Sequence, residues 1–167
     1  MRVLAGTASE ASRYKTTIKR ARACDVASVR EVVPTFANVD RLFDMLNAYL
    51  GRHGVRAIGP RIAIWHAYPT DGVDAEAAVP VEGPPPATDP NAKVRFGRLP
   101  AVESMACVTH RGDSYELGEA YVAVQSWIQA NGFRVSGPNR EVYLVGPESD
   151  ANPAAHVTEI QFPVQPR

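Results

Sequence analysis

The stretch VDRLFDMLNAYLGRHGVRAIGP (residues 39–60) is followed 78 positions later by LGEAYVAVQSWIQANGFRVSGP (residues 117–138), which has the same pattern of apolar residues. In both stretches the apolar residues recur every three or four positions, which predicts a helix with one buried face. The matched positions are Val39, Leu42, Phe43, Leu46, Tyr49 and Leu50 in the first stretch and Leu117, Ala120, Tyr121, Val124, Trp127 and Ile128 in the second. The chain therefore contains an internal repeat.

Both helices carry matched end signals. Gly54 and Gly132 stand where a left-handed C-terminal cap is expected, and an apolar residue follows each of them. We therefore predict helices over residues 38–53 and 115–131, with Asn38 and Ser114 as N-caps.

Strands are predicted before and after each helix. The Gly-Pro pairs at 59–60 and 137–138 are again 78 apart and mark a turn into a strand. The closing strand of each half ends in Pro-Val, here 83 positions apart because the second loop is longer. The predicted strands span residues 23–31, 61–66 and 74–81 in the first half and 101–110, 139–144 and 156–164 in the second. Each half thus reads β-α-β-β.

These elements predict one α+β domain built from two pseudo-twofold-related repeats. Its sheet is expected to be largely antiparallel, with the helices on one face and a concave ligand-binding face on the other. The expected segments are a flexible N-terminal stretch 1–15 and a domain 16–167, the latter divided into repeat one (16–81), a Pro-rich linker (82–93) and repeat two (94–164).

Composition excludes several classes of protein. The 18 basic and 18 acidic side chains balance to a net charge of zero, so the chain lacks the excess of Lys and Arg typical of nucleic-acid binders. Its apolar runs are too short to span a bilayer, and its start does not resemble a signal peptide. We expect a cytoplasmic protein that contacts neither DNA nor membrane directly.

Neither a metal nor a cofactor is indicated. Cys24 and Cys107 lack metal-ligand spacing and are expected to be reduced core residues. The histidines form no HxH or HxxxH pattern; they are His53, His66, His110 and His156.

Strand alternation predicts a polar point among aromatic rings. In residues 61–66, Ile62 and Ile64 are expected to face the helices, and Trp65 therefore faces away from them. By the same rule, Glu141 and Tyr143 share the side opposite the helices. Because Trp65 and Tyr143 are equivalent in the repeat, both aromatic rings should lie near the carboxylate of Glu141.

A carboxylate beside aromatic ring faces suits an organic cation. Coulomb attraction would act together with cation–π contacts worth about 0.5 to 2 kcal/mol each. The expected ligand-binding residues are Trp65, Tyr68, Tyr115, Glu141 and Tyr143. The alternative is that Glu141 is solvated on an open sheet face, with Trp65 and Tyr143 merely covering the strands.

For three further polar residues the sequence predicts a position in the fold but no specific role. His66 is expected to be a hydrogen-bonded core histidine directed toward the helices. Glu76 and Glu159 are equivalent residues on the closing strands. Their positions in the alternation along these strands allow either a charge at the strand edge or a place in the pocket.

Three segments together resemble the GyrI-like small-molecule-binding domains, which also serve as effector-binding modules of AraC-type and MerR-type multidrug-sensing regulators. The segments are REVYLVGP (140–147), TEIQFPV (158–164) and DAEAAVPV (74–81). The resemblance covers about residues 16 to 164 and implies a pseudo-symmetric fold whose central pocket holds lipophilic cations. Glu141 would be the acidic residue of that pocket, with Tyr143 and Trp65 as its aromatic wall.

The resemblance implies several functions. Only Met1 to Lys15 precede the domain, so the chain looks like a stand-alone form that binds or sequesters a drug or toxin. Other stand-alone members resemble hydrolases that open the cyclopropane rings of DNA-alkylating antibiotics, in which Glu141 would be the catalytic residue. A third alternative is a protein that interacts with DNA gyrase. The chain would act as a monomer or a dimer.

Overall fold

The computed structural model describes residues 13–83 and 91–167. Most of the expected flexible N-terminal segment (1–12 of it) and the middle of the expected linker (84–90) lie outside the described residues. The chain divides into two compact units. Of the described residues, the first unit comprises those in 22–102 and 138–142, and the second comprises 13–21, 103–137 and 143–167.

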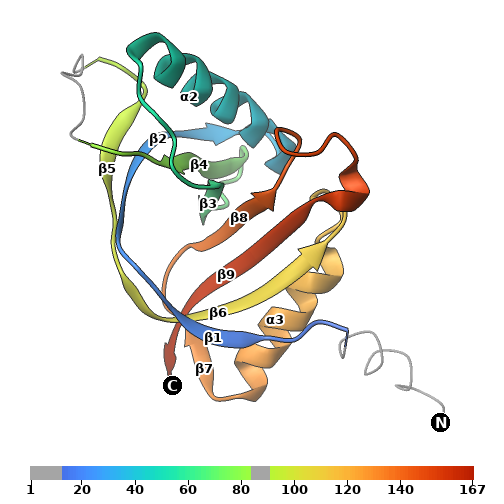
Figure 1. Ribbon diagram of the computed structural model, residues 1–167. Coiled ribbons are helices and arrows are strands. Elements are labelled where there is room, and N and C mark those ends of the chain that lie inside the picture. The colour runs from blue at the N-terminus through green and yellow to red at the C-terminus, as the bar shows by residue number, and fades with distance from the viewer. Residues whose placement is uncertain (1–12, 84–90) are drawn as a thin grey trace. The chain divides into compact units, whose positions relative to one another are not determined.

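The first unit is a sheet with the order β8-β3-β4-β2-β5 and one covering helix, α2, which packs on β2 and β4 (Figure 1). Strand β2 pairs antiparallel with both β4 and β5, and β3 pairs antiparallel with β4. The elements are β2 (Cys24–Val33), the 3-10 turn η1 (Phe36–Asn38), α2 (Val39–His53), β3 (Arg61–Ala67), β4 (Val73–Pro80), β5 (Arg95–Leu99) and the first part of β8 (Asn139–Val145). The six apolar residues predicted for the helix face are the buried residues of α2.

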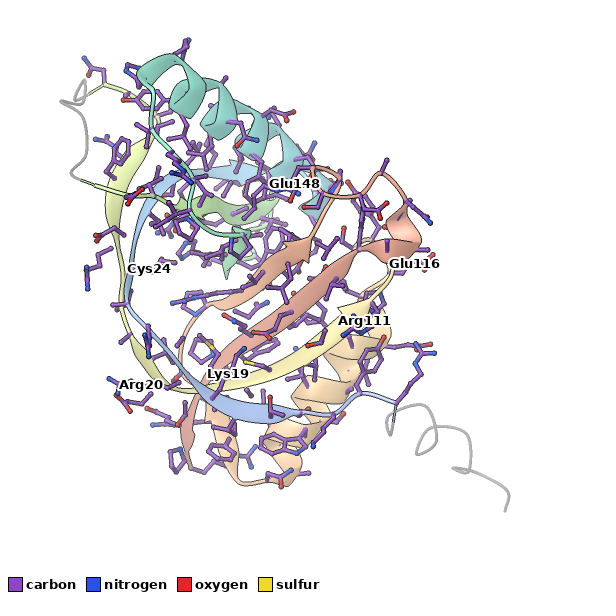
Figure 2. The ribbon with its side chains drawn as sticks, viewed as in Figure 1. Lys19, Arg20, Cys24, Arg111, Glu116 and Glu148 are labelled. Carbon is purple, nitrogen blue, oxygen red and sulfur yellow. The ribbon has the colours of Figure 1, made fainter. Side chains whose placement is uncertain are left out.

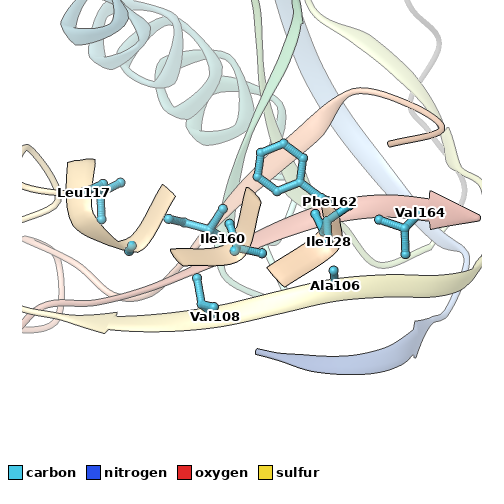
Figure 3. Packing of buried hydrophobic residues seen from close by; sticks show 9 residues of the cluster. Ala106, Val108, Leu117, Ile128, Ile160, Phe162 and Val164 are labelled. Atoms are coloured by element: carbon cyan, nitrogen blue, oxygen red, sulfur yellow. The ribbon is translucent and has the colours of Figure 1, made fainter. Parts of the chain in front are cut away.

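The second unit has the strand order β1-β6-β9-β8, with β7 also paired to β9. Its elements are β1 (Thr17–Ala21), β6 (Val102–Arg111), α3 (Gly118–Ala130), β7 (Phe133–Val135), the 3-10 turn η2 (Pro153–Ala155), β9 (Val157–Pro166) and the end of β8. Helix α3 buries Ala120, Val124 and Ile128 against Ile160 and Phe162 of β9 (Figure 3). Neither α2 nor α3, the two α-helices of the described chain, is long and apolar enough to cross a membrane.

The expected α+β class is confirmed, and the six predicted strands match observed ones within two residues at each end. Gly54 ends α2 with a φ of 62° and donates its N–H to the Leu50 carbonyl, and Gly132 has a φ of 77°. Both values lie in the left-handed region that the predicted caps require. The repeat therefore extends to the backbone conformation at the helix ends.

The predicted start of the second helix is wrong. Helix α3 begins at Gly118 with Leu117 as its N-cap, and Ser114 lies in the preceding turn. In that turn the carboxylate of Asp113 accepts the backbone N–H of Tyr115 at 3.0 Å. An Asx turn of this kind competes with helix formation, so the helix starts later.

Two strands that the sequence pattern missed also follow the repeat. Strands β1 and β5 begin at Thr17 and Arg95, again 78 positions apart. Strand β5 pairs with β2 in the first unit, while β1 neighbours β6 in the second. Each unit therefore includes a strand from the other sequence repeat.

The predicted orientation of β3 is also wrong. The guanidinium carbon of Arg61 lies 4.9 Å from the ring centroid of Phe43 on α2, so Arg61 points toward the helix. Alternation along the strand places Trp65 on that same face, whereas Ile62 and Ile64 project from the opposite one. There they form a separate apolar cluster with Val26, Ala78 and Val142.

Replacing Gly72 with alanine should lower the free energy of unfolding by more than about 1 kcal/mol, because its backbone conformation and its surroundings both exclude a side chain. Gly72 has a φ of 157°, and an added Cβ would lie 2.2 Å from the Val33 carbonyl oxygen. Urea denaturation measures the effect. The matched control is Gly51→Ala in α2, where a Cβ meets nothing within 4 Å. This control should gain about 0.5 to 1 kcal/mol, and equal losses in both variants would contradict the described turn.

Candidate functional site

A buried tryptophan and a buried glutamate meet in the first unit. The indole Nε1–H of Trp65 on β3 donates a hydrogen bond of 2.8 Å to Oε2 of Glu141 on β8. Their residues are only 4% and 7% exposed. The alternative in which Glu141 is solvated on an open sheet face is therefore excluded. This hydrogen bond fixes the orientation of the Glu141 carboxyl group.

Both side chains lie on the face of the sheet that carries α2. Trp65 shares that face with Arg61, and Glu141 alternates with Val142, which belongs to the cluster on the opposite face. The sequence correctly paired Trp65 with Glu141 but placed them on the wrong face. The site consequently lies near the turn that leads into α2, not on the helix-free face of this unit.

Two exposed aromatic rings adjoin this pair. Phe36 of η1 packs edge-on against Trp65 with ring centroids 5.0 Å apart, and Tyr68 lies 5.9 Å from Phe36. Phe36 and Tyr68 are 52% and 63% exposed, unlike Trp65. Partial burial raises the pKa of Tyr68, and the negative charge of Glu141 raises it further. Tyr68 is thus near Glu141, as the sequence predicted.

Phe36 is the residue that the sequence interpretation missed. It lies two residues before the predicted helix, in a turn where Thr35 donates both its backbone N–H and its hydroxyl to Oδ1 of Asn38. These bonds hold the turn that presents the Phe36 ring. The signal was available in the repeat, because the equivalent position, 78 residues later, is Ser114. Phe36 therefore has no aromatic counterpart in the second half.

Tyr115 and Tyr143 belong to the second unit. Tyr115 is 68% exposed and lies in the turn before α3. Tyr143 is partly buried on β8, in the section that belongs to that unit. Their contribution to a ligand site stays a prediction.

The equivalent glutamates of the closing strands both have partners. His66 Nε2 lies 2.8 Å from Oε1 of Glu76, and both side chains are less than one-fifth exposed. Glu159 contacts Lys19 Nζ at 2.7 Å (Lys19 is labelled in Figure 2) and accepts a hydrogen bond from Gln161 at 2.6 Å. His66 is hydrogen-bonded as expected, but its partner Glu76 lies in register with Ile64, on the face opposite α2.

The cysteines behave as core residues. Cys107 is buried, and burial with the nearby charge of Glu159 raises the pKa of its thiol to about 12. Cys24 is partly buried, and burial raises its thiol pKa too. Neither thiol has the low pKa of a nucleophile. Within residues 13–83 and 91–167, no three side chains of the metal-binding types cluster.

A buried, oriented carboxylate beside one buried and two exposed aromatic rings can attract a cation or position a water molecule. A family comparison agrees with this chemistry, because the model of the GyrI-like small molecule binding domain matches residues 14–165. The chain belongs to the GyrI-like family. This match covers both repeats and both units.

Solved structures include relatives of this GyrI-like domain. The C-terminal domain of EcmrR is 25% identical, with a TM-score of 0.80 and coverage of 92% of this chain and 99% of that one. EcmrR in complex with DNA gives a TM-score of 0.81 at the same 25% identity and 92% coverage of this chain. This chain spans 58% of the length of EcmrR in that complex.

Two more distant structures share the fold. A hydrolase encoded by lin2189 of Listeria innocua is 14% identical, with a TM-score of 0.63 and coverage of 90% of this chain and 92% of that one. The protein SAV2435 bound to tetraphenylphosphonium is 16% identical, with a TM-score of 0.57 and coverage of 90% and 94%. No curated protein matches the sequence.

Proposed function

We propose that this GyrI-like domain binds a hydrophobic, often cationic small molecule at Trp65 and Glu141, and so holds or sequesters a drug or toxin. The hydrogen bond between these two buried side chains carries the proposal. A buried carboxylate is costly unless charge and hydrogen bonds compensate it. A cation stacked on the neighbouring rings would lie within Coulomb range of this carboxylate, and the exposed faces of Phe36 and Tyr68 provide apolar contact.

Calorimetric titration with two ligands of similar shape tests this proposal. Tetraphenylphosphonium supplies a delocalised cation surrounded by phenyl rings, and triphenylphosphine oxide supplies a neutral counterpart. We expect saturable binding of the cation and weaker binding of the neutral compound, because only the cation gains Coulomb attraction to Glu141. Equal affinity for both compounds, or no binding of either, would contradict the proposal.

Hydrolysis is the second candidate, favoured by the fixed orientation of the Glu141 carboxylate. In cyclopropane ring opening, a water oxygen bonds to a ring carbon while the strained C–C bond breaks. Glu141 would accept the proton of that water and return a proton to the carbon that leaves with the electron pair. The product is the substrate plus one water. Incubation with a cyclopropane-bearing alkylator followed by mass spectrometry separates the candidates, since a binder returns the compound unchanged.

Trp65→Phe should lower the free energy of unfolding by about 1 to 3 kcal/mol, because it removes a donor from a buried carboxylate. The phenyl ring keeps most of the aromatic contact with Phe36. Trp127→Phe is the matched control, since Trp127 stacks on Phe133 at 5.8 Å in the second unit and makes no hydrogen bond with its indole N–H to a described residue. Urea denaturation of both variants gives the comparison, and equal losses would show that the hydrogen bond contributes nothing.

A further inference from the structure

A cavity with a volume of about 440 Å³ lies in the first unit, and neither Trp65 nor Glu141 lines it. This volume is within the range of small-molecule sites. Its lining is polar, in contrast to the aromatic surroundings of Glu141. The lining residues include Ser28, Arg30, Glu31, Glu76, Lys93 and Arg95.

The cavity is distinct from the Trp65 site. Ile64 pairs with Glu76 and Trp65 pairs with Ala75 between β3 and β4. Directly paired residues share a face and neighbours alternate, so Glu76 and Trp65 project from opposite faces of the sheet. Ser28 is paired with Arg95 in the same sheet. Four of the lining residues, Ser28, Arg30, Glu76 and Arg95, therefore belong to the face that α2 does not cover, whereas Glu31, which pairs with Ala75, belongs to the other face.

The acidic groups of the cavity are already engaged. Glu31 contacts Lys93 Nζ at 3.0 Å and Arg41 Nη2 at 3.1 Å, and Glu76 is in contact with His66. The positive groups of Lys93 and Arg41 lower the pKa of Glu31 and keep it ionised. Glu31 is therefore balanced by two cationic side chains, and one oxygen of Glu76 is occupied by His66.

The basic groups are not all engaged. Arg30 donates from Nε and Nη2 to Asp74 at 3.0 and 2.8 Å. Arg95 is exposed, and its side chain forms no hydrogen bond or ion pair with the described residues. The cavity thus presents a guanidinium that has no partner among residues 13–83 and 91–167, and its five donors match the oxygens of a carboxylate or phosphate.

A buried arginine adds to the positive charge near this cavity. Arg140 on β8 is 9% exposed, and within the described chain no hydrogen bond or ion pair joins its side chain. Its charge interacts with Glu76 and with Cys24, which is labelled in Figure 2. Because it lies within Coulomb range of the lining residue Glu76, Arg140 adds to the positive potential that an anion in the cavity would meet.

We propose that this cavity binds a small molecule carrying an oxyanion, a carboxylate or a phosphate, through the guanidinium of Arg95. The ligand enters a polar cavity on the face opposite Trp65 and Glu141. The site is therefore independent of the one proposed above and takes a ligand of opposite charge.

Calorimetric titration with inorganic phosphate and with acetate at constant ionic strength tests this inference. We expect one of the two anions to bind saturably, which identifies the preferred oxyanion. Arg95→Gln should weaken that binding about tenfold or more, as for the loss of a charge-assisted contact. Its binding of tetraphenylphosphonium should be unchanged.

The matched control is Arg98→Gln on the same strand. Arg98 is paired instead with Asp25 at 3.0 Å, is 64% exposed and lies outside the cavity lining. The loss of an exposed ion pair has little effect on stability, so this variant should bind the anion within about twofold of the wild type. Failure of both anions to bind saturably would overturn the proposal. An equal loss in the two variants would overturn it as well.

Discussion

Glu141→Gln is expected to weaken binding of tetraphenylphosphonium by about 1 to 3 kcal/mol, which is a loss of roughly fivefold to 150-fold. The amide keeps the shape of the side chain and still accepts the Trp65 N–H, but it carries no charge to attract a cation. Triphenylphosphine oxide should lose much less affinity. Calorimetric titration of both ligands into both proteins provides the measurement.

Glu76→Gln is the matched control for Glu141→Gln. Glu76 is a partly buried glutamate of the same unit but lies on the opposite face, where His66 binds it. We expect it to leave the affinity for the cation unchanged. If Glu76→Gln weakens the binding of the cation as much as Glu141→Gln does, the loss of affinity comes from a general loss of negative charge. If the domain is a hydrolase, Glu141→Gln should abolish turnover while a neutral substrate still binds.

Phe43→Ala is expected to lower the free energy of unfolding by about 3 to 5 kcal/mol, which is a large fraction of the stability of a small domain. Phe43 is 2% exposed at the centre of the contact between α2 and its sheet, and the Arg61 guanidinium lies over its ring. Truncation removes buried apolar surface, leaves a cavity and deletes a cation–π contact. Urea denaturation gives the value.

Phe36→Ala provides the contrast with Phe43→Ala. Phe36 is the same type of residue but is 52% exposed, so its truncation should cost no more than about 1 kcal/mol of stability. It should instead weaken tetraphenylphosphonium binding, because its ring adjoins Trp65. Equal destabilisation by the two substitutions would show that α2 does not pack on the sheet as described.

The repeat was predictable because its signals are local. Helix periodicity, the glycine caps and the Gly-Pro turns each depend on a few neighbouring residues, and all recur at one offset. The late start of α3 was not predictable from helix periodicity alone, because the Asp113 side chain competes for the backbone of the first turn. Strands β1 and β5 are short, and most of their residues are exposed, so they carry no alternating apolar pattern.

The orientation of β3 was mispredicted for a definite physical reason. The four residues from Ile62 to Trp65 are all buried, so both faces of the strand are covered. Alternation separates two faces only when one of them is polar, and here a small alanine and a tryptophan alternate with isoleucines. The bulky aliphatic residues looked like the helix-facing set, yet it is Arg61 that contacts the helix.

The proximity of Trp65 and Glu141 was predictable despite this error. The prediction that they lie close together depends only on the repeat offset and on both side chains pointing to the same face of the sheet. It holds whichever face that is. Phe36 was missed because η1 has no periodic pattern. Tyr68 lies near Glu141, whereas the roles of Tyr115 and Tyr143 remain predictions.

The most direct test uses Trp65 as its own reporter. The chain has two tryptophans, so Trp127→Phe leaves Trp65 as the only one. In this background, titration with tetraphenylphosphonium should produce a saturable change in tryptophan emission, with the same dissociation constant as calorimetry. Adding Glu141→Gln should shift that curve to concentrations about fivefold or more higher. Calorimetric binding without any change in Trp65 emission would place the ligand elsewhere and contradict the proposed site.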